Sequence, residues 1–364
     1  MRNENRDMTL HVFNPEHDIA LGANLANFTA PRAGRQLRAD LGWLPALWAA
    51  DGDMVMVGDV ASASRQWKRL AGRIAVMKGV GCSTTKKEVI FVSGKELVRT
   101  KSVTAIDVWG WDRALKASLL RRGVDASVLP SDDYIERVRQ LSHRRTAAQL
   151  LPRLRQDGTV GEAFECATLD EVSQLFNRYG HVVVKAPWSS SGRGVRFVSN
   201  GNRPSSFESW VHNTLLRQGS VMVEPYYNKV KDFAMEFSAD GKGHISYEGL
   251  SLFHTANGAY TGNILATEQA KREMLSRYVS LPLLDSICEG IIAGLDLADY
   301  CGPFGIDMMA VRADNQLLLH PCVEINLRRT MGHVALALSP VQDDVCRVMR
   351  INYTDRYKLS VRKL

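Results

Sequence analysis

Cysteine is scarce in this chain, and its spacing suggests neither a cross-link nor a metal site. Only 6 of the 364 residues are cysteine, and none forms a CxxC pair or stands at ligand-like spacing from histidine. Small secreted folds depend on several disulfides, and structural zinc sites need such pairs. We therefore expect reduced thiols, mostly buried, and neither a disulfide framework nor a structural zinc ion.

Long apolar runs are also missing. The opening residues, MRNENRDMTLHVF, contain no apolar core of signal-peptide length, so a cytoplasmic protein is expected. The stretch Gly249–Thr267 lacks acidic and basic residues for nineteen positions, but its histidine, asparagine, threonine and glycine residues are too polar for hydrocarbon. We expect no membrane partner. The stretch is interpreted as a loop facing a ligand, in which Tyr260 and Asn263 could bond a substrate; structural filler is the alternative.

Neither sign of charge dominates. The chain has 46 Lys and Arg against 39 Asp and Glu, and residues 350–364 alone carry five basic side chains and one acidic one. The remainder is nearly balanced, which argues against nucleic acid as a partner and is compatible with an anionic small substrate. Nucleic-acid binding through the basic tail is kept as an alternative to a solvated face. The length and the 45% hydrophobic content predict two to three globular domains.

The first third of the chain alternates short apolar runs with amphipathic stretches. Strands are expected at Thr9–Phe13, Met54–Val57 and Val103–Val108, and helices at Pro31–Leu41 and Arg113–Arg122. This alternation predicts an α/β domain with a parallel sheet, whose ligands meet the loops beyond the strand carboxyl ends. Those loops are residues 14–18 and 109–112, and they are candidate substrate loops or simple turns. His17 and Asp18 could contact a substrate, or His17 could only bond the backbone of its loop.

The pattern changes near residue 130. Thr168 and Glu171 form a capping-box signature for a helix that ends at Gly180. The strands that follow stand in hairpin order, which predicts an antiparallel α+β body. They are expected at Gly194–Val198, Val221–Glu224, Asp232–Ser238, His244–Tyr247, Gly305–Val311 and Leu317–Asn326.

A loop rich in serine and glycine follows the apolar strand His181–Lys185. Its hydroxyl groups, its accessible backbone N–H groups and its arginine suit an anion such as phosphate. The candidate residues are Ser189, Ser190, Ser191, Gly192, Arg193 and Gly194. Lys185 would be costly to bury alone, so it needs a carboxylate or a phosphate as partner. A mobile hairpin without a ligand is the alternative.

A second candidate site lies on the hairpin of Gly305–Val311 and Leu317–Asn326. Reflection about its turn places Asp307 opposite Cys322, so Glu324 lies diagonally adjacent on the face of Asp307. Asn326 follows on that face. Two carboxylates and an amide oxygen suit Mg²⁺ whose shell nucleotide phosphates complete, and Arg328 could clamp a phosphoryl oxygen. The alternative is that the two acids simply face solvent.

Together and in this order, the two sites resemble the ATP-grasp superfamily. The resemblance covers about residues 142–338, most specifically VVVKAPWSSSGRGV, VMVEPYYNKVKD and GPFGIDMMAV…VEINLRRTMG. It implies an α/β N-terminal domain followed by an α+β ATP-grasp body with two lobes and antiparallel sheets. The implied ranges are 1–130 for the N-terminal domain, 131–218 for the small lobe with the flap, 219–340 for the lobe with the metal hairpin, and 341–364 for the basic tail.

The resemblance also implies roles for individual residues. Lys185 would contact ATP phosphate under the closing loop, Arg145 would stand in for a second nucleotide-binding lysine, and Arg328 would act on the transferred group. Around the nucleoside, Glu224 would sit at the hinge, Tyr226 and Tyr227 would line the base, and Asp232 would hold the ribose. Asp307, Glu324 and Asn326 would bind one or two Mg²⁺ ions, or Mn²⁺. Gly305 departs from relatives that carry an arginine there.

The implied activity is that of an ATP- and Mg-dependent ligase. It would activate a carboxylate as an acylphosphate for attack by an amine or another nucleophile, so a carbon–nitrogen bond is the expected product. Small-molecule carboxylate and nucleophile substrates follow from this, and a homodimer is expected. The alternatives are an ATP-dependent small-molecule kinase of the same fold and a catalytically silent nucleotide-binding protein.

Overall fold

The computed structural model describes residues 8–78, 87–97, 103–189, 194–256, 259–343 and 345–363. The chain divides into two compact units. The first unit consists of Met1–Glu136, Thr261–Ala270 and Arg328–Leu364, and the second of Arg137–Tyr260 and Lys271–Leu327. Residues from the end of the chain thus belong with those from its beginning. The four consecutive domain ranges expected from the sequence stay a prediction.

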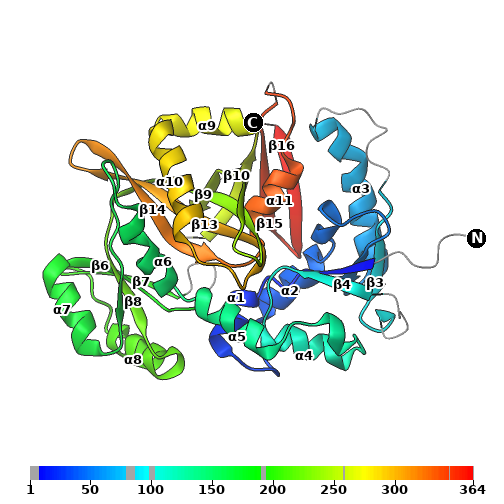
Figure 1. The fold of residues 1–364 in the computed structure, drawn as a ribbon, viewed down its shortest axis with the longest axis horizontal. Helices are drawn as coiled ribbons and strands as arrows, with labels where there is room; N and C mark the ends of the chain where they lie inside the picture. The colour runs from blue at the N-terminus through cyan, green and yellow to red at the C-terminus, as the bar shows by residue number, and fades with distance from the viewer. Residues whose placement is uncertain are drawn as a thin grey trace, which may run out of the picture. The chain divides into compact units, whose positions relative to one another are not determined.

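A parallel sheet forms the centre of the first unit (Figure 1). Its strands are β1 (Met8–Val12), β2 (Met54–Val57), β3 (Ile90–Ser93) and β4 (Val103–Val108), in the order β3-β2-β1-β4. All three pairings are parallel, which confirms the predicted α/β domain. Its helices are α1 (His17–Ala23), α2 (Arg32–Leu41), η1 (Leu44–Leu47), α3 (Val60–Lys78), α4 (Arg113–Arg121), η4 (Ala126–Val128) and α11 (Met331–Leu338), and α5 (Asp132–Leu141) leads into the second unit.

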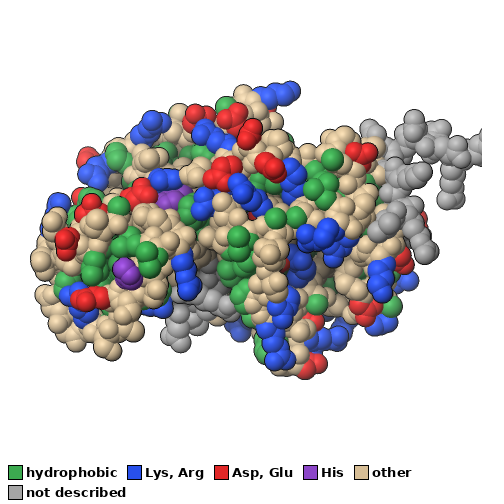
Figure 2. All heavy atoms as spheres, turned by 90° about the horizontal axis from the view of Figure 1, so that it is seen from below, with side chains coloured by type: hydrophobic (Ala, Val, Ile, Leu, Met, Phe, Trp, Pro, Cys, Tyr) green, Lys and Arg blue, Asp and Glu red, His purple; other side chains and the backbone are tan. Residues whose placement is uncertain are grey.

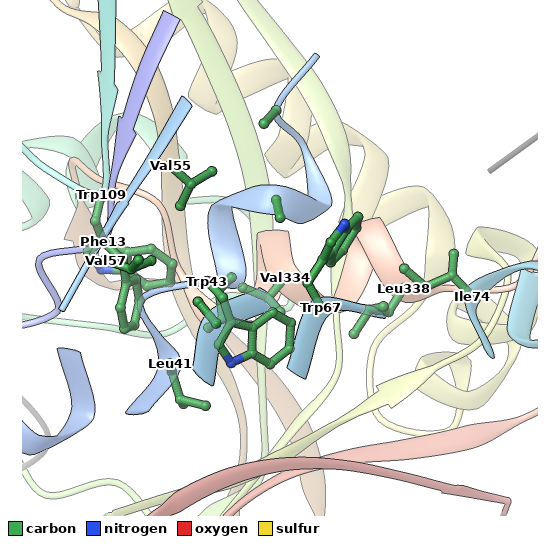
Figure 3. Close-up of a cluster of buried hydrophobic side chains, with 14 of the residues drawn as sticks. Phe13, Leu41, Trp43, Val55, Val57, Trp67, Ile74, Trp109, Val334 and Leu338 are labelled. Atoms are coloured by element: carbon green, nitrogen blue, oxygen red, sulfur yellow. The ribbon is translucent and has the colours of Figure 1, made fainter. Parts of the chain in front are cut away.

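The main core of the first unit joins segments from both ends of the chain. Figure 3 shows Phe13, Trp43, Trp67 and Trp109 gathered with Val334 and other apolar side chains, and all of these are less than 10% exposed. Phe13 and Trp109 meet edge to face, with ring centroids 4.8 Å apart. Because Val334 lies on α11, burial of this apolar surface ties the helix after the metal hairpin to the N-terminal sheet.

The basic tail forms a β-hairpin rather than an irregular segment. In the first unit, Asn263–Leu265 of β12 (Ala259–Leu265) pair with β15 (Arg347–Tyr353), and β15 pairs with β16 (Tyr357–Lys363). Alternate residues Tyr357, Leu359 and Val361 pack against the core. The alternation leaves basic side chains on the other face of β16. On the face drawn in Figure 2, Lys and Arg side chains are spread among neutral, hydrophobic and acidic ones.

The smaller sheet of the second unit is antiparallel. It contains β5 (Phe164–Cys166), β6 (His181–Lys185), β7 (Val195–Ser199) and β8 (Val221–Pro225), in the order β5-β8-β6-β7. Helices α7 (Leu169–Tyr179) and α8 (Phe207–Gln218) pack against it. The predicted capping box is confirmed, since Thr168 accepts from the Glu171 N–H and the helix ends at Gly180 with φ 68°.

The larger sheet of the second unit carries the metal hairpin. Its order is β10-β9-β13-β14, with β9 (Lys229–Asp240), β10 (Ile245–Ser251), β13 (Cys301–Ala313) and β14 (Gln316–Asn326). Phe233, Met235 and Phe237 pair with Met308, Ile306 and Phe304, and all six are at most 1% exposed. One face of the sheet is therefore core, as the alternation predicts. The unit's other elements are α6 (Arg145–Leu150), η5 (Leu151–Leu154), β11 (Phe253–Ala256), α9 (Glu268–Ser276), which begins at the end of the first unit, and α10 (Leu281–Gly294).

The five cysteines among the described residues are all free thiols, as expected. Only Cys166 and Cys322 are buried, so the prediction of mostly buried thiols is wrong for this part of the chain. Within the described ranges, no helix combines the length and the apolar character that crossing a membrane requires.

Candidate functional site

The predicted register of the metal hairpin is wrong, and the correction brings the two acids closer. Asp307 pairs directly with Glu324, not with Cys322, because a β-bulge shifts the register between Asp307 and Met309. Gly305 pairs with Asn326. Directly opposed residues share a face, and so do residues two apart along a strand. Asp307, Glu324 and Asn326 therefore lie on the face opposite the core.

The buried thiol of Cys322 lies within electrostatic range of three acids and the lysine. Burial raises the pKa of its thiol, and the nearby charges of Asp307, Glu224 and Glu324 raise it further, while Lys185 acts in the opposite direction. These charges act on one buried sulfur from β6, β8, β13 and β14. The second unit thus brings together four of the residues that the sequence singled out.

Lys185 finds its anionic partner within the protein. Its Nζ lies 2.6 Å from Oε2 of Glu224, and the two residues are only 6% and 5% exposed. The sequence required a carboxylate or a phosphate at this position, and the structure contains the carboxylate. Glu224, expected at the hinge, is therefore also the counterion of the lysine.

Arg144, which the sequence argument missed, reaches the metal hairpin. Its guanidinium lies 2.8 Å from Oε2 of Glu324 and donates to the carbonyl of Ala186 and the hydroxyl of Ser189 at 3.0 and 3.3 Å. The side chain is 8% exposed. Arg144 therefore joins the start of the flap to a predicted metal ligand.

Arg145 points elsewhere. Its guanidinium donates to Gln140 at 2.6 Å and to Glu165 at 3.4 Å. It lines a cavity of about 510 Å³ together with Arg139, His143, Glu165 and Trp188. The consecutive arginines at the start of α6 were the signal in the sequence. Arg144 is the N-cap and Arg145 the first residue of that helix, and periodicity does not fix the direction of a cap side chain.

The flap is described only at its two ends. The N–H of Ala186 donates to the carbonyl of Gly194 at 2.7 Å, which closes the base of the loop. A Cβ on Gly194 would collide with the side chain of Ser189, so the close approach of the ends requires glycine. The predicted phosphate contacts Ser190, Ser191, Gly192 and Arg193 lie outside the described residues.

The predicted nucleoside contacts lie beyond the end of β8. The Tyr226 ring is 43% exposed and stacks on His181 with centroids 3.8 Å apart. Tyr227 meets His320 edge to face at 5.4 Å, and burial raises the pKa of Tyr227. Asp232 accepts from Lys229 at 2.6 Å and from Thr255 at 2.8 Å. An exposed aromatic ring beside buried polar groups could stack on a base.

His320 is a second residue that the sequence argument missed. It pairs with Met309, two positions along β13 from Asp307, and is 1% exposed. Burial and the nearby charge of Lys185 lower its pKa to about 3, so its imidazole is neutral at pH 7. No described residue bonds either ring nitrogen. A lone histidine in an apolar strand gave no signal from spacing alone.

Arg328 and Asp18 meet within the first unit. Arg328 donates to both carboxylate oxygens of Asp18, from Nε at 2.8 Å and from Nη2 at 2.7 Å. This is a two-point arginine–carboxylate pair, half-buried on both sides. Two residues predicted for separate roles, phosphoryl transfer and substrate contact, thus bind each other in this structure.

The remaining substrate candidates lie on β12. Asn263 is fully buried and pairs with Met349 of β15. Burial strongly raises the pKa of Tyr260. Both positions belong to a strand rather than to the loop expected from the neutral stretch.

The donor set on the hairpin fits magnesium. No group of three or more His, Cys, Asp and Glu side chains among the described residues could by itself hold a metal ion. The hairpin instead offers two carboxylates and one amide oxygen. These hard ligands suit Mg²⁺, which commonly takes the rest of its shell from water and phosphates. Burial and the nearby carboxylates raise the pKa of the Cys322 thiol beside them.

Comparison with known proteins places this geometry in a known fold. No protein-family model and no curated protein sequence matches the chain. Among solved structures, biotin carboxylase from Campylobacter jejuni, in a β-γ-ATP complex, matches 95% of this chain and 76% of its own, with 12% identity and a TM-score of 0.52. The biotin carboxylase domain of Hydrogenobacter thermophilus 2-oxoglutarate carboxylase, with MgADP and bicarbonate, matches 96% and 75%, with 13% identity and a TM-score of 0.52.

At such identity, the likeness bears on fold alone. Both matches run through the parallel N-terminal sheet as well as the two antiparallel sheets, because they span nearly the whole chain. Over almost its entire length the chain has the fold of the biotin carboxylases, which is the ATP-grasp fold that its motifs predict.

Proposed function

We propose that the chain is an ATP- and Mg²⁺-dependent ligase, which activates a carboxylate as an acylphosphate for attack by an amine or another nucleophile. The observation that carries the proposal is the direct pairing of Asp307 with Glu324, which Arg144 joins to the start of the flap that follows Lys185. A metal-bound triphosphate requires cations and acidic oxygens together, and here the two antiparallel sheets of the second unit supply them. The nucleotides bound by the two biotin carboxylases, and the magnesium bound by the Hydrogenobacter domain, support the same assignment.

Each group would have a defined task. Asp307, Glu324 and Asn326 would hold Mg²⁺, as one or two ions and with Mn²⁺ as a substitute, and the metal would neutralise charge on the phosphates. Lys185 and Arg144 would bind phosphate oxygens. Tyr226 would stack on the base. Arg328 is kept as the residue that acts on the transferred group, which requires it to exchange Asp18 for a phosphoryl oxygen.

The proposed reaction needs no covalent bond between the protein and its substrates. A carboxylate oxygen attacks the γ-phosphorus, the bond to the β–γ bridging oxygen breaks, and ADP leaves. A nucleophile then attacks the acyl carbon, and phosphate leaves with the bonding electron pair. Positioning and neutralisation of charge dominate phosphoryl transfer, so the paired cations of this site are the groups that matter.

Release of ADP with Mg²⁺ and panels of carboxylates and amines tests the proposal. Removal of Mg²⁺ should abolish the signal, and Asp307→Asn and Glu324→Gln should each lower turnover by about 10²-fold or more. Glu248→Gln is the matched control, because Glu248 lies on the same sheet but is exposed. Glu324→Gln protein that binds and hydrolyses ATP like the parent would show that the metal assignment is wrong.

The product distinguishes the alternatives. An amide with release of phosphate supports the ligase, and a phosphoester supports a kinase that uses the same site. Tight Mg·ATP binding without turnover across both panels supports a silent nucleotide-binding protein. Light scattering will test the proposed homodimer, the assembly in which the Hydrogenobacter domain was solved.

A further inference from the structure

The cavity of about 510 Å³ beside the start of α6 lies wholly within the second unit. Its lining includes Arg139, Arg145, Glu165 and Trp188, and we call it the α6 cavity. Small-molecule sites in proteins commonly have volumes of about 300–1,000 Å³. Among the described residues, neither Lys185 nor any predicted metal ligand lines it. The α6 cavity is therefore separate from the proposed nucleotide site.

The fixed charges around the α6 cavity are balanced. Arg139 and Arg145 each bring a positive charge, and Glu165 and Glu171 each bring a negative one. His143 also lines the cavity, but burial and the charges of nearby arginines lower its pKa to about 3, so its imidazole is neutral at pH 7. A ligand with one charge of each sign complements this lining better than a simple anion or cation does.

His143 cannot act as the base of a serine nucleophile in this cavity. Ser220 lies 3.2 Å from Nε2 of His143 and donates to Glu165 at 2.8 Å. However, Nδ1 of His143 accepts from the N–H of Arg145 at 3.0 Å, so in the neutral ring Nε2 carries the hydrogen. A serine base needs a lone pair at the nitrogen that faces the hydroxyl. The geometry therefore favours binding over hydrolysis.

Arg145 and Glu165 present complementary groups side by side. Nη1 of Arg145 lies 3.4 Å from Oε1 of Glu165, and Nη2 donates to Gln140 at 2.6 Å. A guanidinium has five N–H donors, so donors remain for a ligand carboxylate. Within the described part of the chain, Ser220 and Arg145 both contact Oε1 of Glu165, which leaves Oε2 for a ligand ammonium group. The two side chains are 36% and 35% exposed, so a ligand can reach them from solvent.

Trp188 forms a wall of the α6 cavity and lies three residues after Lys185 at the start of the flap. The guanidinium of Arg139 stacks over its ring at 3.9 Å, and its indole N–H donates to the Arg139 carbonyl at 2.9 Å. Its backbone N–H donates to Gln218 at 3.0 Å, and the amide of Gln218 donates back to its carbonyl at 3.2 Å. A ligand in the cavity would therefore contact a fixed part of the flap's first end.

We propose that the α6 cavity binds a free α-amino acid, whose carboxylate pairs with Arg145 and whose ammonium group pairs with Glu165. In an α-amino acid the two charged groups flank a single carbon, which suits an arginine and a glutamate in direct contact. The volume of the cavity leaves room for a side chain beside Trp188. The site is distinct from the one that would hold ATP and the ligase substrates.

The bound amino acid should also raise the affinity for nucleotide, and this part of the inference rests on the proposed function. Arg144 bonds Ala186 and Ser189, on either side of Trp188, and contacts Glu324. An amino acid that holds Trp188 in place fixes these partners before the nucleotide arrives, so less order is lost on nucleotide binding. By linkage, the nucleotide raises the affinity for the amino acid by the same factor.

Fluorine NMR of the full chain, labelled with 5-fluorotryptophan, tests binding without nucleotide. The Trp188 signal is the one that disappears in Trp188→Phe protein. A member of a panel of the common L-amino acids should shift this signal saturably. Its N-acetyl derivative, which lacks the ammonium group, and its amide, which lacks the carboxylate, should each bind about 10-fold more weakly or worse. An unmoved signal across the panel, or equal affinity for both derivatives, overturns the proposal.

Variants place the binding within the cavity. Arg145→Gln and Glu165→Gln should each weaken binding of that amino acid by about 10–100-fold. Arg217→Ala, which removes an exposed arginine on α8, should leave the affinity unchanged. Asp307→Asn should leave it unchanged too. A loss in Asp307→Asn with parental affinity in Arg145→Gln and Glu165→Gln would place the amino acid at the ligase site and overturn the proposal.

Calorimetry with Mg²⁺ and a non-hydrolysable ATP analogue tests the coupling. A saturating concentration of the amino acid should raise the parental affinity for the analogue by about fivefold or more, and the same concentration should not do so in Glu165→Gln protein. Equal affinity with and without the amino acid overturns the coupling. A parent that binds the amino acid but not the analogue refutes the ligase and supports the α6 cavity as a site in its own right.

Discussion

The candidate site of the second unit and the loop after β1 in the first unit differ in how their buried polar groups are paired. In the second unit two acids of the site have a cation in contact: Lys185 lies 2.6 Å from Glu224, and Arg144 lies 2.8 Å from Glu324. After β1 in the first unit, Oε2 of Glu16 and Nε2 of His17 are buried and have no donor among the described residues. A nucleotide must therefore exchange partners in the second unit, whereas a ligand of the first unit adds bonds that the protein lacks.

We therefore expect the two regions to respond to a bound ligand in different ways. Desolvation makes a buried ion pair weak evidence for stability, but removal of one partner is costly because the other charge is stranded. The pairs of the second unit keep its cations in place before any phosphate arrives. The unmet acceptors on Glu16 and His17 in the first unit, like those of His320 in the second, lower stability, and a donor would remove that cost.

The largest effect should come from breaking the buried pair of the second unit. Lys185→Met strands Glu224 and should lower the free energy of unfolding by about 3–5 kcal/mol. The double variant Lys185→Met/Glu224→Leu should recover most of that loss, because it leaves no buried charge. Urea denaturation followed by circular dichroism measures both. Glu208→Gln, which breaks the exposed pair with Arg203, should cost at most about 1 kcal/mol.

Were the single and double variants equally unstable, the ion pair would not be what stabilises this part of the fold. The contrast between the two units would then rest on packing rather than on charge.

The next effect concerns the adjacent arginines. Arg144→Ala removes a cation that contacts Glu324 and the flap, and it should weaken Mg·ATP binding by about 10–100-fold, as expected for a charge-assisted hydrogen bond. Arg145→Ala should change the affinity by no more than about threefold. Isothermal titration calorimetry gives both values, and the reverse order would restore the assignment made from sequence.

Low pH should destabilise a cluster of charged side chains in the first unit. His11 lies 3.0 Å from Asp53 and 2.8 Å from Asp107. Burial alone would raise the pKa of both carboxyl groups, but hydrogen bonds from His11 and the charge of Arg329 beside Asp107 hold each pKa below its ordinary value. Their contribution to stability is complete above the unfolded pKa of about 3.9 and is lost as the pH falls through the lower folded values.

His11→Gln tests this cluster. It should lower the free energy of unfolding at pH 7 by about 1.5–3 kcal/mol and flatten its decline below about pH 4. Urea denaturation at pH 7, 5, 4 and 3 measures the change. An equally steep decline in the variant would place the acid sensitivity elsewhere.

The smallest effects compare the capping boxes of the two units. Thr168 caps α7 at an exposed site, whereas Thr330 caps α11 and is only 9% exposed. Thr168→Ala should cost about 1 kcal/mol and Thr330→Ala about 2 kcal/mol, the upper end of measured cap losses. Thermal denaturation ranks them. Equal losses would show that burial adds nothing to a cap.

Much of the fold could be predicted from local pattern. The runs at Met54–Val57 and Val103–Val108 are strands with the expected bounds, and the helix after Thr168 begins and ends as its caps indicate. The identity of the candidate ligands could be predicted, because alternation along β14 places Glu324 and Asn326 on one face whatever the register of the hairpin. The short strand Ile90–Ser93 was missed, since four residues give little periodicity.

The partners within the site could not be predicted in the same way. The bulge that sets Asp307 against Glu324 is a local irregularity of the ladder, and the turn residues do not encode it. The choice of Arg144 over Arg145 depends on the direction of a cap residue, and the pairing of Arg328 with Asp18 joins opposite ends of the chain.

The sequence by itself determined which residue types alternate, where helices start and stop, and that acids, a lysine and a serine-rich loop occur in ATP-grasp order. These properties follow from sterics and periodicity over a few neighbouring residues. Only the tertiary structure decided which charge neutralises which, and which acceptors stay unmet beside β1 and β4. Contacts between distant segments depend on the packing of whole sheets, and burial alone turns an ordinary histidine into an orphaned acceptor.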